Sequence, residues 1–202
     1  MKVRILLGII LLAGIVYYLL GNGEYTPKSG DLIFQSPPHS ALVDAIEGAT
    51  ESRYSHTGIV IQLKNKWIVR EAFHDGVCDT PLQEFVNRGR DSNISVFRVK
   101  KQYEKYLPLF IEKSASYLGR PYDIHYLLDN EHLYCSELVY KSFKDVSGIE
   151  LGKLQRFGDL KWGKYKAFIE KVEGGTIPTD RLVITPVAIT RAKQLKQVYS
   201  SY

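Results

Sequence analysis

Residues 54–61, YSHTGIVI, place a histidine at the head of an apolar run that is typical of a buried β-strand. A second segment, YCSELV at residues 134–139, places a cysteine at the start of an apolar helical pattern. A thiol and an imidazole are the minimum parts of a cysteine nucleophile site. Each residue alone is also typical of a protein core, where it packs without taking part in chemistry. A third group and the fold context therefore decide between the two interpretations.

The histidine strand is predicted to form a hairpin with the apolar run that follows it. A two-residue turn between the strands 56–63 and 67–72 places Gly58 opposite Glu71. His56 and Glu71 then become diagonal neighbours on one face of the sheet, and Gly58 leaves room for the imidazole between them. A carboxylate there can hold one ring nitrogen and leave the other free to act as a base. A shift of one residue in the register would make Glu71 an exposed carboxylate on the other face.

Cys135 is predicted near the start of a helix whose buried stripe includes Leu138 and Val139 and which stops at Gly148. The first turn of a helix presents unpaired N–H groups and a positive dipole, which favour a thiolate and can stabilise an oxyanion. The same position suits a plain core cysteine. The helix start also stays open, because Asp129 or a residue nearer Cys135 could cap it.

Four further histidines are alternatives to His56 as the base, and a second cysteine is a possible disulfide partner of Cys135. His132 would lie one helical turn before Cys135, and His74 adjoins the hairpin. His125 and His132 with a carboxylate match no metal-ligand spacing, so no metal or cofactor is expected. Cys78 lies in a predicted loop and could form a disulfide with Cys135 in an oxidising compartment. The remaining competitor for the base is His39.

The other elements follow from apolar periodicity and turn residues. Ser40 caps a helix with the stripe Leu42, Ala45 and Ile46 that ends near Gly48. No assignment follows for 150–178, where periodicity is weak. The remaining expected elements are a strand at 30–34, a strand at 94–99, a helix at 107–118 with Pro108 in its first turn and Gly119 as its stop, and a strand at 182–184 before a basic tail.

The N-terminus has the composition of a membrane-targeting segment. Lys2 and Arg4 precede residues 5–20, which carry no charge. As a helix this run rises only about 24 Å, short of the roughly 30 Å hydrocarbon core, which favours a cleaved signal. Two tyrosines at its end and a poor cleavage site favour a retained anchor. We therefore expect an anchor or signal at 1–22, a linker at 23–30 and one domain at 31–202.

The two basic residues should stay in the cytoplasm, which places the domain at the periplasm or cell exterior, anchored in the inner membrane or secreted after cleavage. The net charge of +5 is modest and scattered. It lacks the dense basic and aromatic pattern of nucleic-acid binding, so the membrane and a small substrate are the expected partners. Oligomeric state is undefined by the sequence.

Five segments of the chain carry short motifs: GDLIF at 30–34, SHTGIV at 55–60, VREA at 69–72, GRPYD at 119–123 and YCSELV at 134–139. Taken in this order, they resemble the YiiX/YaeF-like permuted members of the NlpC/P60 papain-like superfamily, over about residues 30–145. In unpermuted relatives the cysteine helix precedes the histidine strand, whereas here His56 and Glu71 come before Cys135.

The resemblance implies an α+β, circularly permuted papain-like fold, with an antiparallel sheet of five or six strands and the cysteine helix packed on it. The membrane helix expected before this domain follows from the composition of residues 1–22 and has no support from the shared segments. It implies Cys135 as nucleophile, His56 as base and Glu71 as the group that orients the base. Tyr122, in the turn before the cysteine helix, is expected to line the cleft.

The function expected from these features is a membrane-anchored, extracytoplasmic cysteine hydrolase that cleaves amide bonds of cell-wall peptides or related small amides. Two alternatives stay open. One is a lipid ester or amide hydrolase or acyltransferase of the same superfamily. The other is a non-catalytic tethered binding module whose two cysteines are bridged.

Overall fold

The computed structural model describes residues 25–202, so the anchor or signal expected at 1–22 lies outside the described residues. Within 25–202, no helix has the length and apolar character needed to cross a bilayer. The strands are β1 Leu32–Gln35, β2 His56–Leu63, β3 Lys66–Phe73, β4 Gly76–Pro81, β5 Ser95–Val99, β6 Gln155–Arg156, β7 Leu182–Val183 and β8 Leu195–Ser200. The α-helices are α2 Ala41–Thr50, α3 Leu82–Arg88, α4 Leu107–Ala115, α5 Cys135–Ser147, α6 Lys166–Glu173 and α7 Pro186–Thr190.

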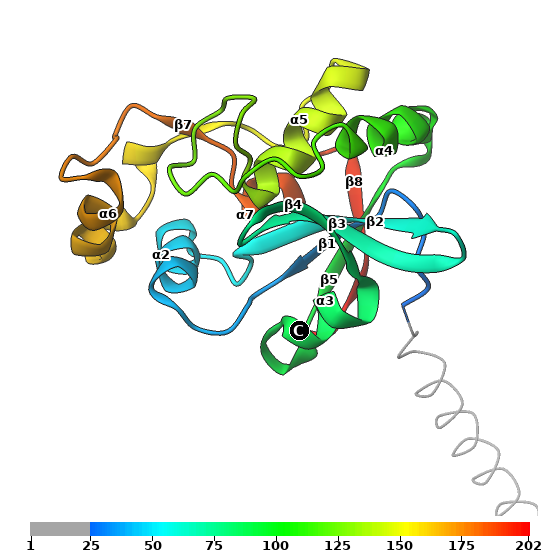
Figure 1. Ribbon diagram of the computed structural model, residues 1–202, viewed down its shortest axis with the longest axis horizontal. Coiled ribbons are helices and arrows are strands. Elements are labelled where there is room, and N and C mark those ends of the chain that lie inside the picture. The colour runs from blue at the N-terminus through cyan, green and yellow to red at the C-terminus, as the bar shows by residue number, and fades with distance from the viewer. Residues whose placement is uncertain (1–24) are drawn as a thin grey trace, which may run out of the picture.

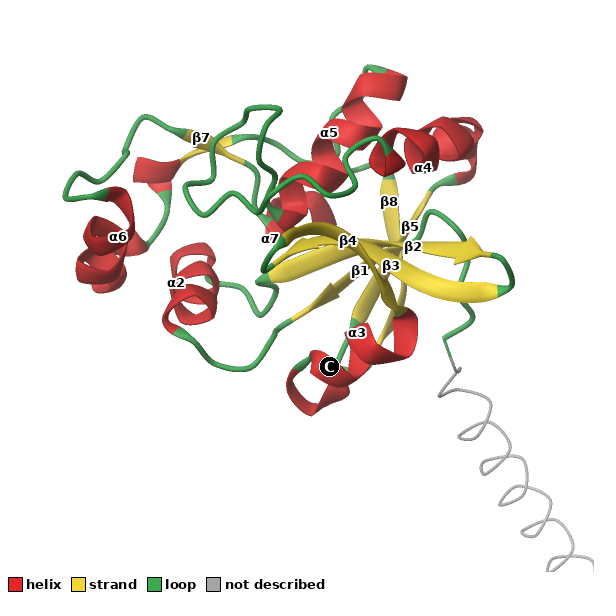
Figure 2. Cartoon of the chain, in the orientation of Figure 1, coloured by secondary structure: helices red, strands yellow, loops and turns green. Residues whose placement is uncertain are grey.

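One antiparallel sheet of six strands, in the order β4-β3-β2-β1-β5-β8, forms the centre of the domain. Helices α4 and α5 cover one face, and the short α3 covers the other (Figure 1). Helices α2 and α6 lie beside one end of this sheet, with the small β6-β7 sheet nearby (Figure 2). The predicted α+β class and antiparallel sheet are therefore confirmed.

The alternation of side chains along the central strands produces two cores. Leu32 and Phe34 of β1 pack under α5 with Phe143, whereas Ile33 between them packs on the opposite face with Phe85 of α3. All five side chains are fully buried. Both faces of β1 are covered, so its first three residues are all apolar, and the strand lies inside the sheet between β2 and β5.

The predicted hairpin register is confirmed. Strands β2 and β3 pair Ile59 with Arg70 and Leu63 with Lys66, and the two turn residues between them have positive φ angles of 47° and 64°. Two consecutive left-handed residues are typical of the tight turn that matches the strand twist. Extending this register outward places Glu71 opposite Gly58, as expected.

The helices also agree with the sequence pattern. Ser40 caps α2, accepting from the Val43 N–H at 3.2 Å, and α5 ends at Gly148 with a φ of 69°. Pro108 lies in the first turn of α4. The helix predicted at 107–118 is too long, because α4 ends at Ala115. Leu118, which lies beyond its end, is exposed.

The loop predicted around Cys78 is wrong, because this segment is the edge strand β4. The strand predicted at 182–184 is confirmed as β7, which pairs with β6 outside the main sheet. The basic tail continues into β8, which pairs with β5. The second half of the predicted linker packs on the domain, where the Tyr25 hydroxyl donates to Asp31 at 3.0 Å.

Candidate active site

His56 and Glu71 meet at the edge of the β2-β3 hairpin. His56 Nε2 lies 2.5 Å from Glu71 Oε2, and both residues are buried, with Glu71 fully so. The carboxylate therefore fixes the imidazole through Nε2 and leaves Nδ1 as the free nitrogen. Hydrogen bonding of a buried imidazole by a carboxylate is the arrangement that orients a catalytic base.

The pair is extended by Arg88, the last residue of α3, which no sequence pattern indicated as a site residue. Its guanidinium donates to Glu71 Oε2 at 2.5 Å. It also lies 3.8 Å above the ring centroid of Phe73, and the His56 ring stacks on Phe85 with centroids 5.6 Å apart. Arg88 thus gives the buried Glu71 carboxylate a cationic partner in addition to His56.

The structure gives a second reason, besides the room that the His56 imidazole needs, why residue 58 is a glycine. A Cβ on this residue would lie 2.4 Å from Val69 Cγ1, 2.9 Å from the Arg70 carbonyl oxygen and 3.3 Å from Glu71 Cβ. The space is therefore occupied by strand β3 itself, and a side chain at Gly58 would push Glu71 away from His56.

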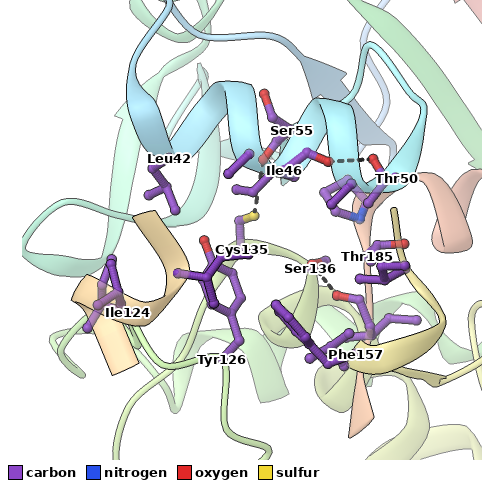
Figure 3. A pocket seen from close by; sticks show the side chains of 18 of the residues that line it. Leu42, Ile46, Thr50, Ser55, Ile124, Tyr126, Cys135, Ser136, Phe157 and Thr185 are labelled. Carbon is purple, nitrogen blue, oxygen red and sulfur yellow. Dashed lines mark hydrogen bonds between the residues drawn. The ribbon is translucent and has the colours of Figure 1, made fainter. Parts of the chain in front are cut away.

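Cys135 is the first residue of α5, and Tyr134 is the N-cap. Its sulfur lies 4.0 Å from the carbonyl oxygen of Ser55, the residue before His56, and its side chain points toward Ser55 and helix α2 (Figure 3). Because the N–H groups of a first helical turn have no intrahelical acceptor, Cys135 lies among free donors. The structure thus brings the sulfur, the imidazole and the carboxylate to one end of the sheet.

The ionisation of His56 depends on its two neighbours Cys135 and Glu71. Burial lowers the pKa of His56, but hydrogen bonding and charge interaction with Cys135, and then with Glu71, outweigh burial and raise it to about 9. Burial raises the pKa of Glu71, but the contacts with His56 and Arg88 outweigh burial and lower it to about 2. These interactions favour an imidazolium at His56, between the Cys135 sulfur and the Glu71 carboxylate.

Glu137 is a second buried carboxyl in the first turn of α5. Burial raises its pKa to about 8, although Lys141 lies 3.3 Å away and lowers it. Its Oε2 accepts from the Tyr134 N–H at 3.4 Å. This residue therefore closes the N-terminus of the helix that presents Cys135.

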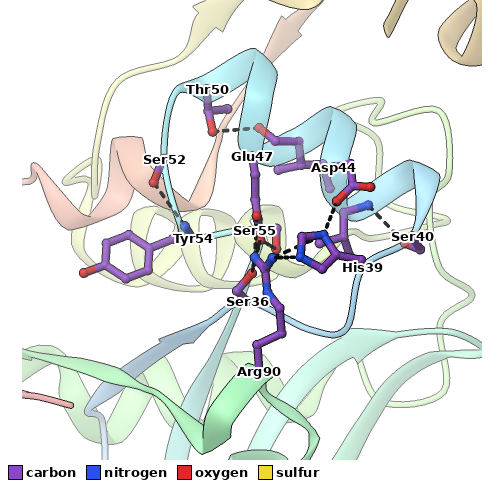
Figure 4. Close-up of polar contacts among 12 residues, drawn as sticks. Ser36, His39, Ser40, Asp44, Glu47, Thr50, Ser52, Tyr54, Ser55 and Arg90 are labelled. Atoms are coloured by element: carbon purple, nitrogen blue, oxygen red, sulfur yellow. Dashed lines mark hydrogen bonds and ion pairs between the residues drawn. The ribbon is translucent and has the colours of Figure 1, made fainter. Parts of the chain in front are cut away.

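A polar cluster connects α2 to the start of β2. The Glu47 carboxylate accepts from Ser55 Oγ at 3.0 Å and from Arg90 at 2.5 Å, and Arg90 also contacts Ser36 and His39 (Figure 4). The cluster holds the backbone next to His56 against a helix that also borders the Cys135 side chain. It was not expected from the sequence, because its members come from three separate segments.

The competing histidines lie apart from this site. His39 belongs to the exposed end of the Glu47 cluster, and His125 is exposed near Glu173. His132 is exposed and outside α5, because that helix begins only at Cys135. His74 follows β3, with its ring 4.0 Å from that of Phe73.

Both cysteines are free thiols, with Cys78 exposed and Cys135 buried. The bridge between them that the sequence left open is therefore absent from the described residues. Cys78 lies opposite Glu71 on the edge strand β4.

Tyr122, expected to line the cleft, lies near Cys135 but is not among the residues that line the pocket beside it, so its role in the cleft stays a prediction. It forms a bridge with Leu133 and packs half-buried against the core, and its hydroxyl lies 3.3 Å from that of Tyr126. Tyr126 lines the pocket beside Cys135.

The pocket beside Cys135 is bounded by α2, the start of α5 and residues from 157 to 186 (Figure 3). The segment 150–178, to which the sequence assigned no structure, thus supplies one wall through Phe157, Leu160 and helix α6. Among residues 25–202, no group of three or more His, Cys, Asp or Glu side chains is placed to hold a metal ion.

Three comparisons with known proteins all point to the same family. Residues 26–199 match the family described as permuted papain-like amidase enzymes, YaeF/YiiX, C92 family. The protein YiiX of Escherichia coli (strain K12) is 32% identical over 181 residues, covering 86% of this chain and 87% of that protein. The crystal structure titled metalloprotein YiiX, from Escherichia coli O157:H7, matches with a TM-score of 0.80 at 30% identity, over 88% of this chain and 99% of that one.

Proposed function

This chain belongs to the permuted papain-like amidase family, a family of cysteine hydrolases, and we propose that it hydrolyses small amides with Cys135 as nucleophile, His56 as base and Glu71 as the residue that orients His56. The observation that carries the assignment is the contact of 2.5 Å between the buried His56 and Glu71 at the end of the sheet where Cys135 begins α5.

In the proposed reaction, the Cys135 sulfur attacks the amide carbonyl carbon and the carbonyl oxygen takes the electron pair. Free N–H groups of the first turn of α5 stabilise that oxyanion. The His56 imidazolium gives its proton to the nitrogen as the carbon–nitrogen bond breaks, and the amine leaves. Neutral His56 then takes a proton from water, whose oxygen attacks the thioester and releases the carboxylic acid.

Glu71 and Arg88 act on His56 rather than on the substrate. Glu71 holds the ring so that Nδ1 is the nitrogen available to Cys135, and it stabilises the imidazolium. Arg88 keeps Glu71 ionised in a fully buried position.

The side chains of residues 25–202 give no support to a metal-dependent variant of this reaction. One relative is titled a metalloprotein. Since residues 25–202 lack a cluster of three or more ligating His, Cys, Asp or Glu side chains, they do not fit a resident metal ion. No step of the proposed reaction uses one.

The two cysteines provide a matched test. Hydrolysis of acetyl-p-nitroanilide by the full chain is expected to be lost in Cys135→Ala and retained in Cys78→Ala, with both variants folded by circular dichroism. Full activity in Cys135→Ala would overturn the proposal.

We also propose that residues 1–22 attach the protein to the inner membrane with the domain on its outer side. The support is the basic pair Lys2 and Arg4 followed by the uncharged run 5–20. Alkaline phosphatase fused after residue 202 is expected to be active and to sediment with membranes. An inactive fusion would contradict the orientation, and a soluble active one would indicate cleavage.

A further inference from the structure

A second cleft lies outside the active site, behind one wall of the pocket that borders Cys135. Neighbouring residues of that wall line different spaces: Phe157 and Leu160 line the pocket, whereas Arg156 and Asp159 line the cleft. The opposite side of the cleft is formed by the end of helix α7 and the turn that follows it. The two sets of lining residues have no member in common, so the cleft is a separate site.

The two sides of the cleft meet at small residues. Gly152 on one side and the buried Ala188 and Ala192 on the other belong to its lining. Gly152 has a φ of 90°, and a Cβ there would lie 2.6 Å from the Ala188 carbonyl oxygen. Only glycine permits this conformation and this close approach without strain. The charged side chains of the lining, by contrast, are exposed to solvent.

Three cations line the cleft without an ion-pair partner among residues 25–202, namely Lys153, Arg191 and Lys193. The backbone that carries Lys193 is held in place, because its carbonyl oxygen accepts from Lys100 Nζ at 2.7 Å. A cleft lined by charges of one sign concentrates counter-ions of the opposite sign. These side chains therefore favour an anionic ligand.

The other charges of the lining are mostly compensated. Glu150 lies 2.8 Å from Lys144, and Arg156 pairs with Asp180. Asp159 is the carboxylate of the lining that has no ion pair in the described part of the chain. Against the three unpaired cations, it leaves a surplus of two positive charges. A phosphate monoester, with a charge of about −1.5 to −2 at neutral pH, matches this surplus, whereas a single carboxylate does not.

A buried amide adds a neutral donor to the same cleft. Gln194 lines the cleft and is only 6% exposed. Its backbone carbonyl accepts from the Lys100 N–H at 2.9 Å, but its side-chain amide has no hydrogen-bond partner within residues 25–202. A buried polar group without a partner costs free energy, which a ligand that pairs with it recovers. The amide NH2 group can donate to a phosphate oxygen.

We propose that this cleft binds a phosphate monoester group through Lys153, Arg191 and Lys193, with the Gln194 amide as an additional donor. The inference goes beyond the proposed function, because no residue of the cleft belongs to the hydrolytic site. The same contacts would recognise a soluble phosphate ester and the terminal phosphate of a lipid headgroup, so the experiment separates these two sources.

Binding is measured by isothermal titration calorimetry on the full chain in neutral detergent at about pH 8, where a phosphate monoester is a dianion. Glycerol 3-phosphate is expected to bind at least about tenfold more tightly than glycerate, which offers a single carboxylate charge to the same cations. Equal affinities for the two compounds would overturn the proposal.

Matched substitutions locate the site. Lys193→Gln and Arg191→Gln are each expected to weaken the binding of glycerol 3-phosphate by at least about tenfold, because each removes a charge-assisted hydrogen bond. Gln194→Leu is expected to weaken it by about threefold, because it removes the neutral donor. Lys171→Gln, on the exposed side of α6 and outside the cleft, is expected to leave the Kd unchanged. Equal effects of Lys193→Gln and Lys171→Gln would mean that general surface charge binds the anion, and the inference would fail.

Dihexanoyl phosphatidic acid identifies the source of the phosphate. If glycerol 3-phosphate binds as tightly as this lipid, and both lose affinity in Lys193→Gln, the ligand is a soluble phosphate ester. If the lipid binds more tightly and loses affinity in Lys193→Gln, the ligand is a lipid headgroup. If neither compound binds, or neither depends on Lys193, the inference is wrong. Amide hydrolysis is not part of these measurements, so their outcome is independent of the proposed function.

Discussion

His56 Nε2 lies 2.5 Å from Glu71 Oε2, a contact across two neighbouring strands in which neither side chain is appreciably exposed to solvent. A charged pair in such surroundings is stable only when each partner has further contacts. Arg88 supplies one for Glu71, and Cys135 supplies one for His56. The catalytic proposal follows from this chain of contacts, because it favours the imidazolium next to a sulfur.

Replacing Glu71 with Gln should lower kcat/KM by about 10- to 100-fold, since a hydrogen bond to a charged group contributes about 1.5–3 kcal/mol. The alkaline limb should also move. Contacts with Cys135 and Glu71 raise the pKa of His56 to about 9, so activity that needs the imidazolium is lost as pH rises through that value.

In Glu71→Gln the alkaline limb of the kcat/KM profile should therefore lie at lower pH than in the wild-type protein. Profiles of kcat/KM against pH measure both effects, with Glu84→Gln on the exposed face of α3 as control. An unmoved limb would refute the role of Glu71.

Arg88→Met should destabilise the fold by about 2–4 kcal/mol, because it leaves the Glu71 carboxylate buried without its cation. Urea denaturation measures the change. The control is Arg156→Met, whose ion pair with Asp180 is largely exposed and should contribute less than about 1 kcal/mol. Equal losses in the two variants would show that Arg88 is an ordinary surface residue.

Glu137→Gln should stabilise the protein at alkaline pH. Burial raises the pKa of Glu137 to about 8, so the wild-type chain loses stability between the ordinary value of 4.5 and about 8, where the unfolded carboxyl is ionised and the folded one is not. The amide does not titrate, and above pH 8 the variant should be more stable by about 1–3 kcal/mol. Melting temperatures measured from about pH 5 to 9 test this. If the melting temperatures of the wild-type protein and of Glu137→Gln changed in parallel with pH, the prediction would be wrong.

Glu47→Ala should loosen α2, because it removes the acceptor shared by Ser55 and Arg90. The helix is then expected to exchange its amide hydrogens faster at residues 41–50, and stability should fall by about 2–4 kcal/mol. Exchange followed by mass spectrometry resolves the helix from the rest of the chain. Unchanged protection of α2 would mean that the cluster does not hold it in place.

The sequence was sufficient for the parts of the fold that depend on local pattern. The register of β2 and β3 follows from a two-residue turn, and this register places Glu71 beside His56. The order of His56, Glu71 and Cys135 along the chain agrees with the permuted family. The fold class and family were therefore predictable.

Contacts between distant segments were not predictable in this way. Arg88 reaches Glu71 from a short helix that has no strong periodic pattern, and the partners of Glu47 come from separate loops. The sequence predicts a loop around Cys78, because an edge strand shows little of the alternation of apolar and polar residues that indicates a strand. The wall of the pocket at 157–173 was missed for the same reason, since 3₁₀ turns and a short amphipathic helix give weak signals.

The measurement that tests the account most directly is competition between the two thiols for iodoacetamide at about pH 7, followed by peptide mapping. Exposure alone favours Cys78, because Cys135 is only 2% exposed. Burial raises the pKa of Cys78, whereas Cys135 lies at a helix N-terminus beside His56. The account predicts that Cys135 is alkylated at least about tenfold faster, and that His56→Ala removes this advantage. Faster alkylation of Cys78 in the wild-type chain, or an advantage of Cys135 that survives His56→Ala, would contradict it.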